Sequence, residues 1–379
     1  MRIPTLTGMV KAWAVGPALI LALILALILA PGVARACPVC IDLPERTVAD
    51  HALEDWIVVL ARADDENPFR FAPVEILRGT REDIADAPEI PFLVDAATRR
   101  AMARNPDLSV LLTYGPPTDY TGRTPGSGLW YRHVAITPDR RALIEDVLDD
   151  GALWDWGMTS DQARFDFFAA RITDPDPVVQ RMALTEISRA PYAMIRRIDR
   201  APPTQELLQR LTRVTAFPLT PITILLLGLD DSPAAEAAVR RGFDRALDGA
   251  GTRIGAWIVA GIERGGAAAL AQATARLRDS PEMSFEARRD ILTALTVTGT
   301  ARPGLRPAIA PALVETVERY PDHAGDLAYS FYTWKDWSIL PLYSAMLEGE
   351  LDHDTRYILE IVVATGRAEQ AAPLSAGDL

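Results

Sequence analysis

Cysteine is nearly absent from this chain of 379 residues, which contains only Cys37 and Cys40. A four-cysteine zinc site needs a second Cys-x-x-Cys pair, and haem attachment needs a histidine directly after the pair, so both are excluded. Catalytic signatures are missing too, because no Gly-x-Ser-x-Gly, His-Glu-x-x-His or P-loop motif occurs. The sequence therefore predicts a protein without enzymatic activity, and no catalytic residue is nominated.

Lysine is almost as scarce, with Lys11 and Lys335 the only two, and acidic side chains outnumber basic ones to give a formal net charge of −12. Removal of residues 1–36 takes away three basic side chains and leaves 36 against 51 acidic ones, so the net charge falls to about −15. A field of this sign repels phosphate backbones and anionic lipids. Nucleic acid is therefore not an expected partner.

The N-terminus has the order of features of a secretory signal peptide. A weakly positive start precedes an apolar run from Ala18 to Ala30, Pro31-Gly32 interrupts that run, and Ala34-Arg35-Ala36 supplies the small residues of a cleavage site. We therefore expect residues 1–36 to be a signal peptide. The mature protein is expected in the periplasm or secreted, as a protein of the bacterial cell envelope.

Two alternatives to cleavage remain open. The uncharged stretch that begins at Ala12 approaches the ~20 residues that span a bilayer, so the segment could stay as an anchor. Cys37 would be the first mature residue and could carry a lipid, although Ala34 and Arg35 do not fit a lipobox. Membrane association is expected only under these two alternatives.

From Asp55 to Ile136, short apolar runs alternate with turn-forming residues, which predicts five strands. The expected strands are 56–62, 69–77 with a bulge near Ala72-Pro73, 90–94, 108–114 and 130–136, and a helix over 138–148 comes after them. The cysteine start, the run Phe71-x-x-Val74-x-Ile76-Leu77-Arg78-Gly79 and the later strands resemble the netrin/TIMP-type OB-fold module. This resemblance implies a small five-stranded β-barrel over residues 37–150. Because no further cysteine can pair with Cys37 or Cys40, it does not extend to the disulfides or the protease-inhibitor role of that family.

From Ser160 onward, apolar residues recur at helical spacing in segments joined by short Gly, Pro or Asp links. The expected helices include 178–187, 222–229, 234–247, 254–264, 267–277, 285–295, 305–320 and 355–364. Asp176-Pro177, Ser232-Pro233 and Ser280-Pro281 fit an N-cap followed by proline at the first helical position. Asp174 to Leu184 resembles a HEAT repeat, and Tyr332 to Ser338 resembles exported HEAT-like bacterial proteins with no assigned activity. The resemblance implies an α-α solenoid.

Together these patterns predict an α+β multidomain protein. The expected parts are a signal peptide (1–36), an OB-like five-stranded β-barrel domain (37–150), a HEAT-like α-helical solenoid domain (151–367) and a disordered tail (368–379). A solenoid exposes an extended surface and no catalytic set is visible, so the expected function is that of a non-catalytic binding or scaffold protein. The expected partner is another protein of the cell envelope.

The Cys37-Pro38-Val39-Cys40 pair has several interpretations. A local disulfide would stiffen the mature N-terminus. Two thiolates could instead exchange disulfides or bind Cu(I), which gives the alternative function of a periplasmic thiol redox or copper-handling protein. Lipid attachment and intermolecular pairing are further possibilities. No cofactor other than this Cu(I) ion is expected.

The remaining candidates are histidines and aromatic residues. His51, His133, His323 and His353 do not fall within metal-binding spacing of one another. Asp352-His353-Asp354 lies at a helix start and is expected to act as a cap, with weak metal binding as the alternative. Tyr332, Trp334 and Trp337 cannot all face inward on one helix. They are the candidate partner-binding residues, and core packing is the alternative.

Overall fold

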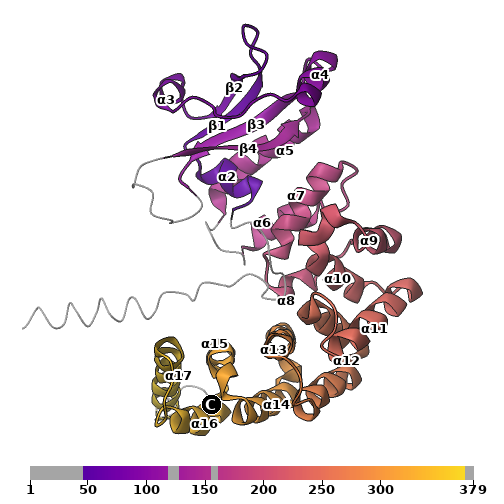
Figure 1. Ribbon diagram of the computed structural model, residues 1–379, viewed down its shortest axis with the longest axis vertical. Helices are drawn as coiled ribbons and strands as arrows, with labels where there is room; N and C mark the ends of the chain where they lie inside the picture. Colours follow the sequence, from indigo (N-terminus) through magenta and orange to yellow (C-terminus); the bar gives the residue numbers. More distant parts are fainter. Residues whose placement is uncertain (1–45, 118–127, 155–160, 372–379) are drawn as a thin grey trace, which may run out of the picture. The chain divides into compact units, whose positions relative to one another are not determined.

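The computed structural model describes residues 46–117, 128–154 and 161–371 (Figure 1). The expected signal segment, Cys37 and Cys40 lie outside the described residues, as does the chain after Ala371. Within those ranges the protein is α+β and mostly helical, with 16 α-helices and one four-stranded antiparallel sheet. The described residues all belong to one compact unit, so the change of pattern near residue 150 is a change from sheet to helix within that unit.

The sheet has the strand order β2-β1-β3-β4, and its strands are β1 (Ile57–Ala63), β2 (Phe71–Arg78), β3 (Ser109–Gly115) and β4 (Leu129–Ile136). Two register shifts interrupt the β1–β2 pairing, and one leaves Val74 without a partner, one residue beyond the expected bulge. Among the described residues the sheet is open, and the expected five-stranded closed barrel is not found. Residues 90–94 contribute only the isolated bridge between Arg70 and Leu93, because Pro88 and Pro91 remove backbone donors from this stretch.

Both faces of the sheet are covered. Successive residues of β1 point to opposite sides. Between β2 and β3 the chain forms two helices, α3 (Arg81–Asp86) and α4 (Ala96–Arg104). On one side of the sheet, Ile57, Val59 and Ala61 of β1 pack with Val94 and with Met102 of α4.

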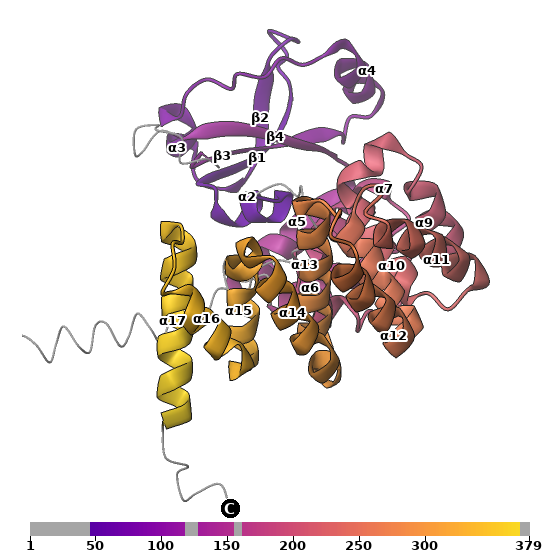
Figure 2. The ribbon, with the colours of Figure 1, turned by 60° about the horizontal axis from the view of Figure 1, so that its bottom comes forward.

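On the other side of β1, Val58 and Leu60 pack against Ile144 of α5 (Pro138–Asp150) and Met182 of α7 (Pro177–Ser188). Figure 2 shows α5 and the short helix α2 (Val48–Glu54) on this side of the sheet. The helix α2 therefore lies between the sheet and the helical part of the chain.

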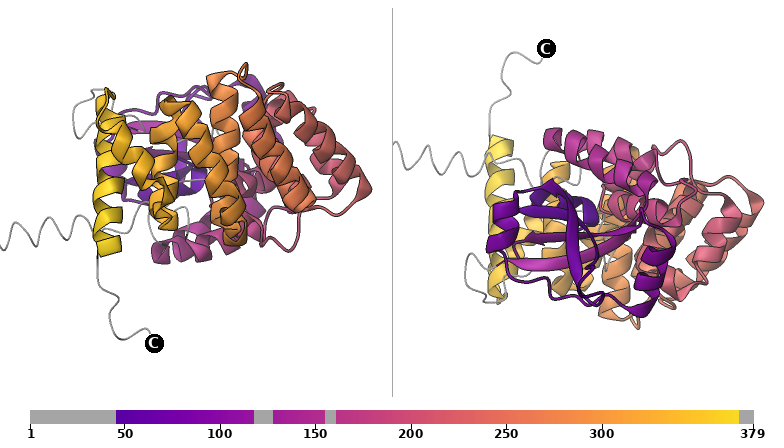
Figure 3. Two further views of the ribbon diagram at one scale, coloured as in Figure 1. Left: turned by 90° about the horizontal axis from the view of Figure 1, so that it is seen from below. Right: turned by 90° about the horizontal axis from the view of Figure 1, so that it is seen from above.

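The rest of the chain is helical. It comprises α6 (Gln162–Ala169), α7, α8 (Tyr192–Ile195), α9 (Thr204–Arg210), α10 (Thr220–Leu229), α11 (Pro233–Leu247), α12 (Ile254–Asp279), α13 (Phe285–Ala301), α14 (Arg306–Arg319), α15 (Ala324–Trp334), α16 (Leu340–Met346) and α17 (His353–Ala371). Several helices contact both the next helix and the one after it: α10 and α14 pack on α12, and α13 and α17 pack on α15. Figure 3 shows the orange and yellow helices following one another side by side. One apolar core joins them to Ala49, Ala52 and Leu53 of α2.

Helix α12 contains the two segments that the sequence predicts as separate helices. Gly266 has a φ of 55° and a ψ of −134°, which are not helical values, and this break falls between residues 264 and 267 as expected. The helix is long and apolar enough to cross a membrane by length and composition, but 56% of its most apolar window is buried inside the protein. Its apolar character is therefore that of a core helix.

The helix caps agree with the sequence at two of the three expected sites. The side chains of Asp176 and Ser232 accept hydrogen bonds from backbone N–H groups at the starts of α7 and α11. The cap expected at Ser280 is wrong, because Ser284 caps α13 instead and Ser280 lies at the end of α12. Asp352 accepts a hydrogen bond from the backbone N–H of Thr355, as expected of a cap. Helix α17 continues to Ala371, so the first four residues of the expected tail, all able to continue a helix, are helical.

Candidate functional site

A cleft of about 640 Å³ opens where the start of α2, strand β4 and helix α7 meet. Its walls combine apolar side chains, among them Trp130 and Met182, with the imidazoles of His51 and His133 and the carboxylate of Glu186. Small-molecule sites commonly show this combination of apolar walls and a few converging polar groups. The cleft is therefore the candidate functional site.

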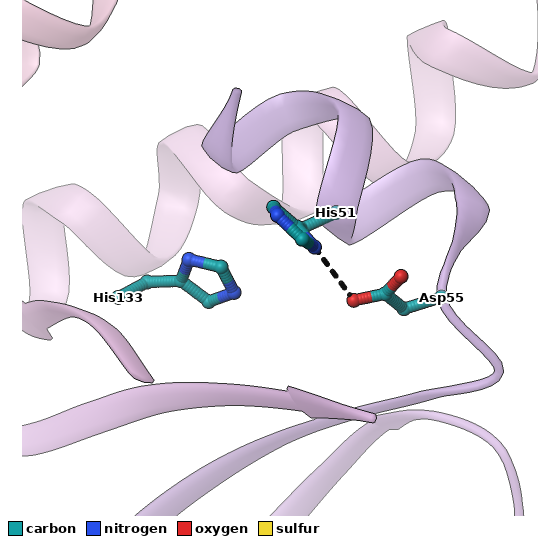
Figure 4. A group of neighbouring side chains, drawn as sticks. All are labelled: His51, Asp55 and His133. Atoms are coloured by element: carbon teal, nitrogen blue, oxygen red, sulfur yellow. Dashed lines mark hydrogen bonds and ion pairs between the residues drawn. The ribbon is translucent and has the colours of Figure 1, made fainter. Parts of the chain in front are cut away.

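His51 of α2 and Asp55, the residue directly after this helix, point toward the same place. The helix begins with a capping box: Thr47 accepts a hydrogen bond from the Asp50 backbone at 3.1 Å, and the Asp50 carboxylate accepts one from the Thr47 backbone at 2.9 Å. This box fixes the start of a helix of only seven residues. Because His51 and Asp55 are four residues apart, their side chains lie on one face and meet, with His51 Nδ1 2.9 Å from Asp55 Oδ2 (Figure 4).

Asp55 is 1% exposed and is the acceptor at the centre of the site. Its Oδ1 accepts a hydrogen bond from Arg46 at 2.7 Å, and the hydroxyl of Thr113 also hydrogen-bonds to the carboxylate. Burial raises the pKa of Asp55, but the hydrogen bonds from His51, Thr113 and Arg46 outweigh this effect and hold the pKa below its usual range. The carboxylate is therefore ionised and fully engaged.

His133 reaches the site from β4. Its Nε2 lies 2.8 Å from Thr113 Oγ1, and its ring centroid lies 4.8 Å from that of His51. Burial, followed by the nearby positive charge on His51 when protonated, lowers the pKa of His133 to about 3, although Asp55 acts in the opposite direction. His133 is therefore a neutral imidazole at neutral pH.

These three residues could hold a metal ion, because one ligand atom from each lies within 4.8 Å of the others. The sequence spacing did not reveal this group, since His51 and His133 are far apart in the chain and only β-sheet pairing brings them together. The one local signal was the His-x-x-x-Asp spacing of His51 and Asp55.

A network of buried charges holds α2 against α6 and α7. The Arg164 guanidinium of α6 lies 2.6 Å from Asp50 Oδ1 and 2.8 Å from Glu186 Oε2, and Arg189 also binds Asp50. Burial raises the pKa of Asp50, but the two arginines and the hydrogen bond from Thr47 lower it overall. Burial raises the pKa of Glu186, and Arg164 offsets this effect only in part. Glu186 Oε1 has no hydrogen-bond partner among the residues described.

The residues proposed from sequence lie elsewhere. Tyr332 is 36% exposed, whereas Trp334 is 7% exposed and donates its Nε1 hydrogen bond to Thr300 inside the helical core. Trp337 is half-buried and contacts the edge of the Tyr332 ring. Of the three aromatic residues, Tyr332 is therefore the one that offers exposed surface.

No family model, no curated protein and no solved structure matches this chain. Its function must therefore be inferred from the geometry of its own residues.

Replacement of Arg164 by Met should destabilise the protein by about 3–5 kcal/mol, because it removes the ion-pair partner of Glu186 and leaves Asp50 with one arginine in a buried setting. Urea unfolding followed by circular dichroism would measure this change. The control is Arg197→Met, at an exposed position, for which a change within about 0.5 kcal/mol is expected. Equal effects of the two substitutions would contradict the role given to the network.

His133 should make stability depend on pH. The unfolded chain protonates this ring near pH 6.5, and the folded protein does so only near pH 3, so the folded state gains nothing from protonation in between. The contribution of the neutral His133 ring to the free energy of unfolding is fully present above about pH 6.5. It is lost as the pH falls, by up to about 1.4 kcal/mol per pH unit. Urea unfolding at pH 7.5 and 5.5 should show a larger loss for the wild type than for His133→Gln. Equal losses in the two proteins would show that His133 is not held neutral.

Proposed function

We propose that the protein is a non-catalytic, exported binding or scaffold protein that presents a helical surface to a protein partner in the bacterial cell envelope. The supporting observation is the packing of α10, α12 and α14, and of α13, α15 and α17, in which each helix contacts the helix two places along the chain. Stacked helical hairpins of a HEAT-like solenoid pack in this way. Such stacks bury one face of each helix and leave other faces at the surface.

The N-terminal part is proposed to be an OB-like module with a rudimentary third strand. In an OB-like barrel the first strand pairs with the second and fourth, and the fourth pairs with the fifth. If residues 90–94 count as the third strand, the order β2-β1-β3-β4 agrees with this scheme. The bridge between Arg70 and Leu93 lies at the edge where such a strand would pair.

The last helices carry the exposed apolar surface that suits a protein partner. Tyr332 on α15 is 36% exposed, and Tyr357 and Ile361 on α17 are 61% and 41% exposed. Tyr357 and Ile361 are four residues apart and share one face of α17, which packs against α15. Exposed aromatic residues of this kind often anchor protein interfaces.

A photo-crosslinking amino acid placed at Tyr332 or Tyr357 should capture one defined protein from the native cell envelope, and both positions should give the same product by mass spectrometry. The matched control is Val214, which is 90% exposed on the segment before α10. A product at Val214 alone, or no product at Tyr332 and Tyr357, would count against the proposed surface.

The alternative function, thiol redox or copper handling through Cys37 and Cys40, is supported by the Cys-x-x-Cys spacing alone. On this alternative, the reduced mature chain should take up one Cu(I) ion in competition with a chromogenic chelator, and Cys37→Ser/Cys40→Ser should take up none. A disulfide with a reduction potential below about −300 mV and no copper uptake would remove the alternative.

A further inference from the structure

The hydrogen bonds around Asp55 determine where the two imidazoles of the cleft carry their protons. An ionised carboxylate can only accept hydrogen bonds, so His51 Nδ1, which faces Asp55 Oδ2 at 2.9 Å, must carry a hydrogen. A neutral imidazole has one N–H and one lone pair. In the neutral form of His51, the lone pair is therefore on Nε2.

The same argument applies to His133 through Thr113. The Thr113 hydroxyl has one hydrogen, and the ionised Asp55 carboxylate, whose pKa this hydroxyl lowers, is the negatively charged acceptor beside it. With that hydrogen directed to Asp55, Thr113 Oγ1 accepts the hydrogen bond from His133 Nε2, which lies 2.8 Å away. The lone pair of His133 is therefore on Nδ1.

Both lone pairs belong to rings that line the cleft of about 640 Å³. The ring centroids lie 4.8 Å apart, and Figure 4 shows the rings next to each other with Asp55 bound to one of them. Across 46–117, 128–154 and 161–371, no hydrogen-bond donor reaches His51 Nε2 or His133 Nδ1. Two neighbouring imidazole rings thus line a space large enough for a ligand.

We propose that His51 Nε2 and His133 Nδ1 bind a divalent transition-metal ion of the copper and zinc type, with its remaining coordination positions open to the cleft. Imidazole nitrogen suits these ions, whereas magnesium and calcium prefer oxygen ligands. Asp55 has the place of the outer carboxylate that often accepts the second ring N–H of a ligating histidine and fixes its orientation.

The surrounding charges favour a modest affinity and a neutral or anionic additional ligand. Arg46 lies 2.7 Å from Asp55 and compensates its charge, so the ion would not be held by a strong negative field. Arg181 also lines the cleft and forms no ion pair within the described part of the chain. An ion with open positions beside this arginine could bind a small carboxylate. This metal site is independent of the surface on α15 and α17.

The protein for the test is the mature chain with Cys37→Ser and Cys40→Ser, because this removes the thiols as competing ligands. Isothermal titration at pH 7.5 should show one site for Cu²⁺ and a weaker one for Zn²⁺, in the general order of divalent affinities, and none for Mg²⁺. His51→Gln and His133→Gln should each lower the Cu²⁺ affinity at least about tenfold, and Asp55→Asn should lower it by about 10- to 100-fold. His353→Gln, at an exposed position on α17, is the matched control and should leave the affinity unchanged.

Two further measurements on the unsubstituted site decide the matter if a variant does not fold. Long-range ¹H–¹⁵N spectra of the wild type should show the hydrogen of His51 on Nδ1 and that of His133 on Nε2, and Zn²⁺ should shift the other nitrogen of each ring. Electron paramagnetic resonance of the Cu²⁺ form should show coupling to two imidazole nitrogens. The opposite tautomers, the absence of a one-to-one site, or binding that is lost in His353→Gln and kept in His133→Gln would overturn the proposal.

Discussion

Three hydrogen-bond donors from separate parts of the chain converge on the buried carboxylate of Asp55: His51 of α2, Arg46 before it and Thr113 of β3. The ionised carboxylate can accept all three with its two oxygens. This single acceptor therefore joins the first described helix to the centre of the sheet. The fit is tight, because a side chain at Gly115 would place its Cβ 2.0 Å from Asp55 Oδ1.

The charge network around Arg164 secures the opposite side of α2. Arg164 pairs with Asp50 on α2 and with Glu186 on α7, so α2 is held between the sheet and the helices by polar groups at both ends. Asp50 is stabilised as the anion by two arginines, whereas Glu186 shares one and keeps a carboxylate oxygen without a partner among the described residues. Glu186, which lines the cleft, is therefore the less fully hydrogen-bonded carboxylate of a network that mainly stabilises the fold.

Local sequence patterns predicted the elements better than the site. Four of the five expected strands and the caps at Asp176 and Ser232 are present, because alternation, apolar runs and capping residues act over a few positions. The strand expected at 90–94 did not form, since Pro88 and Pro91 weaken pairing in a way that hydrophobicity does not report. The neighbouring positions of His51 and His133 depend on the order of strands in the sheet, which no local pattern contains.

Packing also crosses the point where the sequence changes from strands to helices. Val58 and Leu60 of β1 share a cluster with Val179 and Met182 of α7, and Leu53 of α2 belongs to the helical core. A fragment cut at residue 150 would therefore expose the apolar side chains of β1 and α2 that α7 and the helical core cover, and it would leave the Asp50 carboxylate without either arginine. Such a fragment should be prone to self-association, and dissection of this protein should keep β1 to β4 together with α6 and α7.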